Sequence, residues 1–258
     1  MTRALVFDSG VGGLSVVGEI RARLPALALD YAADDAFRPY GARTRGELRA
    51  RLPGLVRGLA DASEADLVVV ACNTASTAAL DAIRAHSRAP VVGVVPAVKP
   101  AADRTRTGVI GVLGTPATVR QDYVDELVRD FARGREVRRL GSTALVDMAE
   151  RKLRGEGVDV VALRDEIAPL FGAGLDTVVL ACTHFPLLAD ELALAAPHTV
   201  TWIDSGEAIA RRVEALLGDV QSDNRPDTAL SVGGAFPPAR AEAFRRYGFG
   251  KTVVLPSA

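Results

Sequence analysis

Short apolar runs without polar alternation recur along this chain, and segments with helical periodicity separate them. Such runs are typical of strands that are covered on both faces, and strands that alternate with helices form parallel sheets. The predicted strands are Ala4–Phe7, Leu67–Ala71, Val91–Val95, Val109–Leu113, Val178–Ala181 and Thr199–Ile203. The predicted helices include Glu47–Leu59, Thr74–Ser87, Tyr123–Phe131 and Ala208–Leu217. The sequence therefore predicts an α/β protein with mostly parallel sheets flanked by helices.

Two pairs of segments are similar to each other within the chain. Val68–Ser76 reads VVVACNTAS and Val178–Pro186 reads VVLACTHFP, so each has a buried strand, Ala-Cys and then a hydroxyl-bearing segment. In Ala4–Gly12 (ALVFDSGVG) and Val109–Ala117 (VIGVLGTPA), an apolar strand enters a glycine-containing turn. These repeats predict two pseudo-symmetric α/β domains.

The predicted first domain is discontinuous, with residues 1–95 and 206–258, and the second has residues 96–205. Each cysteine would follow the carboxyl end of a strand. In open parallel sheets that edge is where ligands bind. We therefore expect the active site in the cleft between the two domains.

Composition and charge exclude several classes of protein. The 258 residues are 48% hydrophobic and 24% charged, which excludes a disordered chain, a collagen-like fibre and a disulfide-dense scaffold. With 31 basic and 32 acidic residues, no global field favours direct binding of nucleic acid or an anionic membrane. Ala4–Phe7 is too short for a signal-peptide core, and no apolar run approaches the ~18 residues of a membrane span. We expect a cytoplasmic protein whose two cysteines are reduced thiols.

Cys72 and Cys182 are the strongest candidates for chemistry. A free cysteine is commonly a small buried hydrophobe, but these two occupy matching positions of the internal repeat. A helix that begins just beyond each sulfur would lower the pKa of the thiol through its dipole and its N–H groups. Two cysteines without CxxC spacing cannot complete a zinc site, so no metal is expected. A disulfide between them stays open.

Polar residues accompany both cysteines. His184 is a candidate proton partner for Cys182, and Asp8 ends the first strand, although an aspartate there could instead cap a helix. The segment Asp8–Gly13 fails the GxGxxG test because Ser15 occupies the third glycine position, yet its glycines leave N–H donors for an anion such as a carboxylate. Pro39–Gly41 is predicted to form a turn that exposes a phenol and a backbone N–H.

Transfer of the α-proton of an amino acid is one reaction that suits two thiols on opposite sides of a substrate. A thiolate on one face takes the α-proton of an amino acid, and a thiol on the other face returns a proton, without metal or cofactor. The α-proton is a very weak acid, so hydrogen bonds to the α-carboxylate and exclusion of water must assist its removal. The residues alone thus lead to the hypothesis of a cofactor-free proton transfer.

Several motifs resemble those of the bacterial glutamate racemases, within the aspartate/glutamate racemase superfamily. The clearest are Phe7–Val16 (FDSGVGGLSV), Pro39–Gly41 (PYG), Ala71–Ser76 (ACNTAS), Gly93–Val98 (GVVPAV), Gly114–Val119 (GTPATV) and Ala181–Leu188 (ACTHFPLL). Leu145–Glu150 and Ile203–Ala210 match more loosely. The matches follow the family's order to about residue 217, and together they are highly specific.

The resemblance implies that the chain interconverts L- and D-glutamate without pyridoxal phosphate or metal, and that the D-glutamate enters peptidoglycan. It implies catalytic roles for Cys72, Cys182, Asp8 and His184, with Cys72 taking the proton from D-glutamate and Cys182 from L-glutamate. It implies substrate binding by Asp8, Ser9, Tyr40, Gly41, Asn73, Thr74, Thr183 and His184. Glu150 falls on an acidic position near the second cysteine.

Two features depart from the family's pattern. Ser142-Thr143 and Asp147 stand where the family often shows Cys-Pro and a further proline, which bears on local loop geometry rather than on the thiols. The chain begins directly at its first predicted strand, so the resemblance implies no activation by a cell-wall precursor.

Two alternative functions stay open. One is a superfamily relative that racemises aspartate or acts on another small dicarboxylic acid; the second is a non-catalytic binding or inhibitor protein on the same fold. Two cysteines accompanied by Asp8 and His184 favour racemisation, and the DSGVGG and PYG segments favour glutamate. Nothing in the sequence addresses a gyrase-inhibiting role, and family members include both monomers and homodimers.

Overall fold

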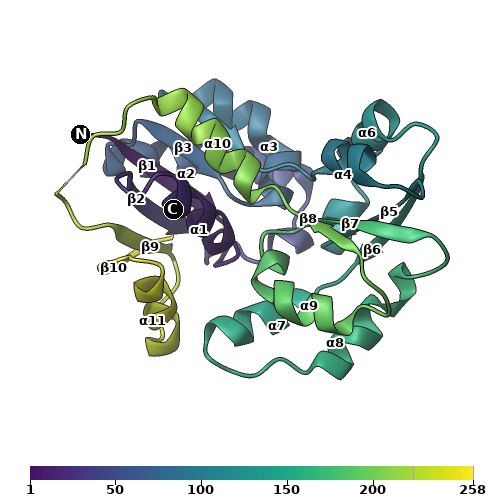
Figure 1. Cartoon of the computed structure of the whole chain (residues 1–258). Helices are drawn as coiled ribbons and strands as arrows, with labels where there is room; N and C mark the ends of the chain where they lie inside the picture. Colours follow the sequence, from purple (N-terminus) through teal and green to yellow (C-terminus); the bar gives the residue numbers. More distant parts are fainter. Residues whose placement is uncertain (223, 258) are drawn as a thin grey trace. The chain divides into compact units, whose positions relative to one another are not determined.

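The computed structural model describes residues 1–222 and 224–257 (Figure 1). It divides into two compact units, one formed by Met1–Val94 with Gly206–Ala258 and the other by Val95–Ser205. Residues 223 and 258, which belong to the predicted first domain, lie outside the described residues. Both units are α/β with parallel sheets flanked by helices, so the predicted fold class is confirmed.

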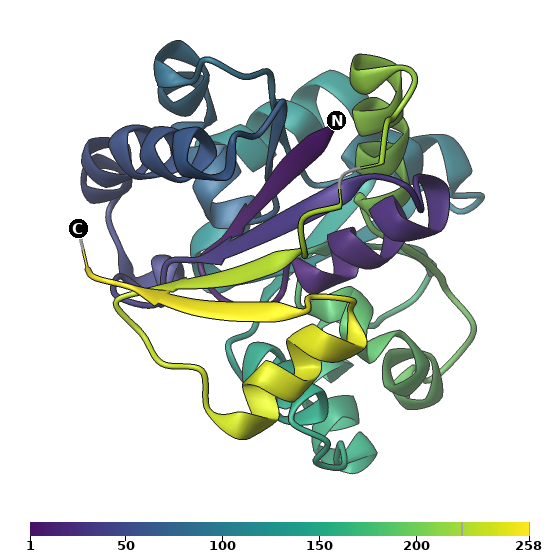
Figure 2. The ribbon, with the colours of Figure 1, turned by 90° about the vertical axis from the view of Figure 1, so that its left-hand side faces the viewer.

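The first unit contains a parallel six-stranded sheet with the order β10-β9-β2-β1-β3-β4. Its strands are β1 (Arg3–Asp8), β2 (Ala28–Ala33), β3 (Leu67–Val70), β4 (Val91–Gly93), β9 (Thr228–Val232) and β10 (Lys251–Leu255). The last two come from the C-terminal segment, and Figure 2 shows them in yellow and yellow-green beside β2. This segment therefore extends the sheet that the N-terminal residues begin.

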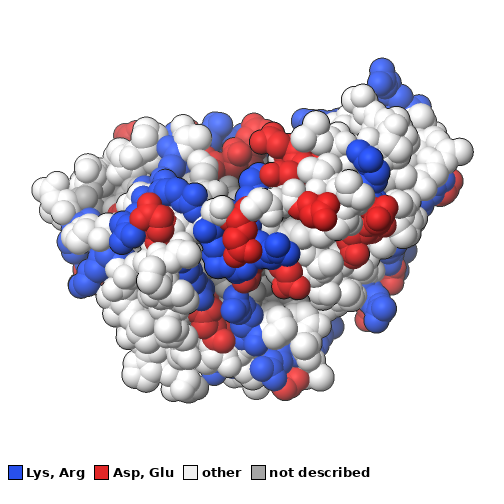
Figure 3. All heavy atoms as spheres, turned by 90° about the horizontal axis from the view of Figure 1, so that it is seen from below, with Lys and Arg blue, Asp and Glu red and all other residues white. Residues whose placement is uncertain are grey.

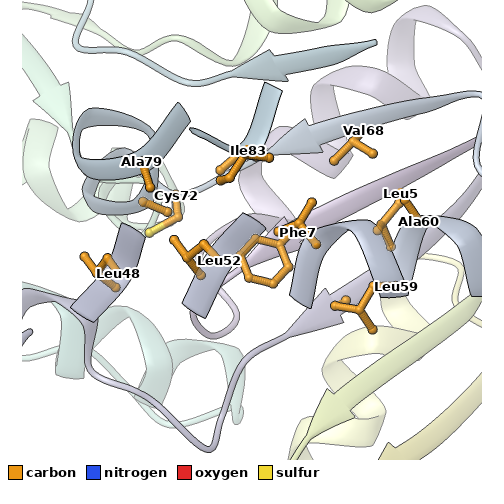
Figure 4. Close-up of a cluster of buried hydrophobic side chains, with 14 of the residues drawn as sticks. Leu5, Phe7, Leu48, Leu52, Leu59, Ala60, Val68, Cys72, Ala79 and Ile83 are labelled. Atoms are coloured by element: carbon orange, nitrogen blue, oxygen red, sulfur yellow. The ribbon is translucent and has the colours of Figure 1, made fainter. Parts of the chain in front are cut away.

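Helices cover both faces of this sheet. They are α1 (Leu14–Arg23), η1 (Tyr40–Ala42), α2 (Arg45–Ser63), α3 (Asn73–His86), α10 (Gly206–Leu217) and α11 (Pro238–Arg246). The helices α2 and α3 pack together, as do α1 and α10. A capping box between Thr44 and Glu47 fixes the start of α2, since each side chain accepts a hydrogen bond from the other residue's backbone N–H. Figure 4 shows the apolar cluster that α2 and α3 form with β1 and β3.

The second unit contains a parallel four-stranded sheet with the order β6-β5-β7-β8. Its strands are β5 (Val109–Gly114), β6 (Glu136–Gly141), β7 (Leu175–Ala181) and β8 (Thr201–Ile203). Its helices are α4 (Val98–Arg104), α5 (Pro116–Val119), α6 (Asp122–Phe131), α7 (Ala144–Leu153), α8 (Val160–Ile167), η2 (Ala168–Leu170), η3 (Phe185–Leu188) and α9 (Ala189–Ala195).

The strand order repeats between the two units. Four strands of the first sheet run β2-β1-β3-β4, and those of the second run β6-β5-β7-β8. In this correspondence β1 matches β5 and β3 matches β7, which are the two pairs that the repeated sequence segments predict. The cysteines therefore follow equivalent strands, and β9 and β10 are additions to the first sheet.

Charges are mixed on the surface. On the face drawn in Figure 3, basic and acidic side chains are interspersed, as the net charge of −1 leads one to expect. Among the residues that the structure describes, no helix combines the length and the apolar character that a membrane span requires.

Asp176 ties β7 to the segment that precedes β5. The Thr105 and Thr177 hydroxyls and the backbone N–H groups of Arg106 and Thr107 donate hydrogen bonds to its carboxylate. Burial opposes ionisation, but these donors hold the pKa of Asp176 well below its ordinary value. The second unit is thus stabilised by an ionised carboxylate near the amino ends of its central strands.

We expect Asp176→Ala to lower the free energy of unfolding by about 2 kcal/mol at neutral pH, because several charge-assisted hydrogen bonds are lost. A depressed pKa means that the contribution is complete above the ordinary carboxyl pKa and is lost as pH falls through the folded-state value. Urea denaturation at several pH values should show the difference from wild type narrowing below about pH 4. A difference in the free energy of unfolding that did not change with pH would show that the ionisation of Asp176 does not contribute to stability.

Candidate functional site

Cys72 lies at the junction of β3 and α3. It is the N-cap residue of α3, with extended backbone angles, and it is buried. Its thiol is 3.7 Å from the Ser9 hydroxyl, to which it can donate a hydrogen bond. Figure 4 shows the sulfur at one end of the apolar cluster, near Leu48 and Ala79. The helix predicted just beyond this cysteine is confirmed, so the positive end of the α3 dipole lies at the thiol.

Asp8 ends β1 beside β3 and is also buried. Its Oδ2 accepts a hydrogen bond from the backbone N–H of Gly13 at 2.9 Å, and the Tyr31 hydroxyl lies 3.2 Å from the same oxygen. Asp8 is not the N-cap of α1, because Gly13 occupies that position. The alternative that Asp8 caps this helix is therefore wrong. The carboxylate instead accepts hydrogen bonds from the N–H of the N-cap residue Gly13 and from the Tyr31 hydroxyl of β2.

Gly13 is required by close packing around Asp8. A Cβ there would lie 2.8 Å from the Tyr31 hydroxyl, 3.0 Å from the Ala71 Cβ and 3.2 Å from the Asp8 Cβ. All three separations are shorter than ordinary van der Waals contact. Any side chain at position 13 must therefore displace the group that holds Asp8.

We expect Gly13→Ala to reduce kcat/KM by about tenfold or more and to cost roughly 1–3 kcal/mol of stability, because the overpacked site shifts Asp8. Gly18→Ala is the matched control, since Gly18 lies within α1 and the atom nearest to its added Cβ, among the described residues, would belong to Tyr247, at 3.8 Å. Steady-state kinetics and thermal unfolding of both variants check this expectation. Full activity in Gly13→Ala would show that the tight packing does not position the carboxylate.

Tyr40 differs from the expectation of an exposed phenol. The η1 turn buries it to 2% exposure, and its hydroxyl donates a hydrogen bond to Asp34 Oδ2 at 2.7 Å. Arg51 donates to both oxygens of the same carboxylate, at 2.7 and 2.8 Å. Burial and the Asp34 charge raise the pKa of Tyr40 well above its ordinary value, so it stays a donor. Pro39, Gly41 and Ala42 of this turn are exposed.

Asn73 and Thr74 form the first turn of α3, directly after Cys72, and both are buried. The side-chain Oδ1 of Asn73 has no hydrogen-bond partner within the described part of the chain. An unsatisfied buried acceptor is costly unless a donor from outside reaches it. Next to a thiol, this oxygen is suited to receive a ligand's N–H.

Cys182 follows β7 in the second unit and is likewise buried and free. Its sulfur lies 3.8 Å from His184 Nδ1, and His184 Nε2 lies 3.5 Å from Glu150 Oε1 of α7. The imidazole thus stands between a thiol and a carboxylate, which is an arrangement suited to proton transfer. Thr183, which separates Cys182 from His184 in the sequence, is also buried.

The α-helix expected directly beyond Cys182 is absent from this part of the described chain. A 3-10 turn, η3, follows instead, and α9 begins only at Ala189. Pro186 lies at the start of this turn and contributes no backbone N–H. Here the prediction of a helix dipole at the sulfur is wrong, and the neighbouring imidazole is the polar group that contacts the thiol.

Within each unit, the residues proposed from the sequence gather at the carboxyl edge of the sheet. The first unit contributes Asp8, Ser9, Tyr40, Gly41, Cys72, Asn73 and Thr74, and the second contributes Glu150, Cys182, Thr183 and His184. Sequence reasoning missed three buried or half-buried supports, Tyr31, Asp34 and Arg51. No local motif marks them, because each contacts its partner from another segment.

Comparison with known proteins agrees with these features. The family model described as Asp/Glu/Hydantoin racemase matches residues 13–213. A glutamate racemase of Vibrio campbellii is 48% identical over 242 residues, covering 93% of this chain and 90% of the relative. A glutamate racemase of Vibrio cholerae is 51% identical over 220 residues, covering 85% and 82%.

A solved structure of a glutamate racemase is also similar to this chain. The Escherichia coli glutamate racemase, crystallised in complex with L-glutamate and the activator UDP-MurNAc-Ala, is 42% identical to this chain and superposes with a TM-score of 0.93. The match covers 100% of this chain and 99% of that structure. Sequence identity of this size over nearly the full length, together with the shared fold, shows that the chain belongs to the glutamate racemases of the Asp/Glu/Hydantoin racemase family.

Proposed function

We propose that this chain interconverts L-glutamate and D-glutamate by moving the α-proton between two thiols, without a cofactor. The observation that supports this most strongly is the presence of a buried cysteine, outside any disulfide, after the equivalent strand of each sheet. Each cysteine also has a polar group in contact, Ser9 for Cys72 and His184 for Cys182. Membership of the family supports glutamate as the substrate.

In the proposed reaction the two thiols act from opposite faces of one glutamate. Cys72 as thiolate removes the α-proton of D-glutamate, and Cys182 returns a proton to the opposite face. The reverse reaction exchanges these roles. Asp8 assists the first thiol and His184 the second. Glu150 forms an ion pair with the imidazole when the imidazole is protonated.

Substrate binding is proposed for polar groups at the two sheet edges. Ser9, the Tyr40–Gly41 turn and Thr74 would hold the carboxylates, and Thr183 and His184 would do so from the second unit. The orphaned Asn73 Oδ1 would accept a hydrogen bond from the substrate ammonium. These contacts would stabilise the negative charge that develops when the α-proton leaves.

The biological setting follows from the family. The D-glutamate produced would supply peptidoglycan synthesis, in the cytoplasm, and a homodimer is one arrangement that the protein could adopt.

The test of this function is incubation of the purified chain with L-glutamate under reducing conditions, with no cofactor added. We expect the optical rotation to decay to zero. L-aspartate and substituted malonates serve as competing substrates. Faster turnover of aspartate would favour the alternative of a superfamily relative with another substrate, and no turnover of any would favour a non-catalytic binding protein.

A further inference from the structure

The Tyr31 hydroxyl lies between two oxygen acceptors. It is 3.2 Å from Asp8 Oδ2 and 3.0 Å from the backbone carbonyl oxygen of Gly10. A phenol has one proton to donate and can accept one or two hydrogen bonds. The hydroxyl can therefore donate to only one of these oxygens fully at a time.

The ring of Tyr31 is held in place by its surroundings. Tyr31 belongs to β2, between β1 and β9, and is fully buried. Phe244 and Phe249 pack edge-on against it, with ring centroids 5.1 and 5.9 Å away. The oxygen position is thus fixed, and only the O–H bond is free to rotate.

The phenol keeps its proton. Burial, with the Asp8 charge as a further cause, raises the pKa of Tyr31 well above its ordinary value. Tyr31 therefore cannot act as a base, and it has no role as a proton store. Its effect on the reaction must come from hydrogen bonding alone.

We propose that Tyr31 is a positioning residue that stabilises Asp8 in both of its protonation states. When Asp8 is ionised, the hydroxyl donates to Oδ2. When Oδ2 holds a proton, the carboxyl donates to the tyrosine oxygen while the hydroxyl turns to donate to the Gly10 carbonyl. In the proposed reaction Asp8 exchanges its proton with the Cys72 thiol. Tyr31 neither gains nor loses a proton.

This inference rests on the proposed function, in which Asp8 assists Cys72. The Gly13 N–H also donates to Oδ2, but a backbone N–H cannot accept a hydrogen bond. It stabilises only the ionised carboxylate. The Tyr31 hydroxyl can do both, which distinguishes it from a group that merely fills the core.

The test uses Tyr31→Phe, which keeps the ring and removes the hydroxyl. We expect kcat/KM to fall by roughly tenfold, the loss associated with one hydrogen bond to a charged group. The α-deuterium isotope effect on kcat/KM should rise for D-glutamate, whose deuterium moves to Cys72, and not for L-glutamate. Tyr247→Phe, at the half-buried end of α11, is the matched control and should match wild type.

A second variant keeps the result interpretable if Tyr31→Phe also loses stability. Asp8→Asn removes the group that alternates between two protonation states. The double variant Asp8→Asn/Tyr31→Phe should therefore have an activity less than twofold below that of Asp8→Asn alone. A symmetric change in the two isotope effects, or additive losses in the double variant, would overturn the inference while the proposed function stands. Absence of racemisation by wild type would instead refute the proposed function.

Discussion

Replacement of Cys72 by serine should lower kcat/KM for glutamate by roughly 10³-fold, because a positioned proton-transfer group contributes about 10²–10⁴-fold and an alcohol is a far weaker acid than a thiol. Cys182→Ser should have an effect of similar size. The loss must be equal for both enantiomers in each variant, since their free energies are identical and the equilibrium constant is unity. Polarimetry from either enantiomer measures it.

The isotope effects should distinguish the two cysteines. In Cys72→Ser, proton transfer at residue 72 limits the rate, so α-deuterated D-glutamate should show a large primary effect and α-deuterated L-glutamate a small one. In Cys182→Ser the pattern should be reversed. The same pattern in both variants would contradict the assignment of one thiol to each face, and thermal unfolding checks that each variant is folded.

The second large expected effect is a loss of stability when the ion pair between Asp34 and Arg51 is broken. The Tyr40 hydroxyl donates a hydrogen bond to this Asp34. Asp34 has a fully buried side chain, and Arg51 is its cationic partner. Removing one member of a buried pair leaves an uncompensated charge, which typically costs about 3–5 kcal/mol. We therefore expect Arg51→Leu to lower the free energy of unfolding by about 3 kcal/mol, as measured by urea denaturation. It should also raise KM, because the Tyr40–Gly41 turn loses its support.

Arg49 offers a matched control on the same helix. It forms a similar two-contact pair with Asp81, and hydrogen bonding to Arg49 lowers the pKa of Asp81 to about 2. This pair is largely exposed, so Arg49→Leu should change stability and KM little. Equal losses in Arg49→Leu and Arg51→Leu would show that burial of the Asp34 pair is not what makes it important.

Most of the central strands could be predicted from the sequence, because strands covered on both faces are short apolar runs. The strands β2, β6, β9 and β10 were not predicted. In β2, Asp30 and Tyr31 interrupt the apolar pattern, and they are tolerated because Arg3 pairs with the carboxylate and Asp8 accepts from the phenol. Partners from other segments made this strand stable, and hydrophobic periodicity does not contain that information.

Contacts with other segments also explain why the sequence-based prediction for Tyr40 is wrong. The Tyr40 phenol was expected at the surface because the turn sequence gives no sign of Asp34 or of Arg51 on α2. The contact of His184 with Cys182, in contrast, is predicted, since both lie in one motif at the end of a strand. The contact of Ser9 with Cys72 is not, because Ser9 enters only as a substrate-binding position that the resemblance implies. Residue types and strand ends are local features, whereas burial of a polar side chain depends on the fold.

The most direct test of two-thiol proton transfer is the position of deuterium early in the reaction of L-glutamate in D₂O. Separation of the two enantiomers by chiral chromatography, before about a tenth of the substrate has reacted, followed by mass spectrometry, measures deuterium at Cα in each of them. Transfer between two bases predicts D-glutamate that carries deuterium at Cα and residual L-glutamate that retains its proton. D-glutamate that keeps the original proton, or L-glutamate that exchanges as fast as product forms, would indicate a single base and contradict this account.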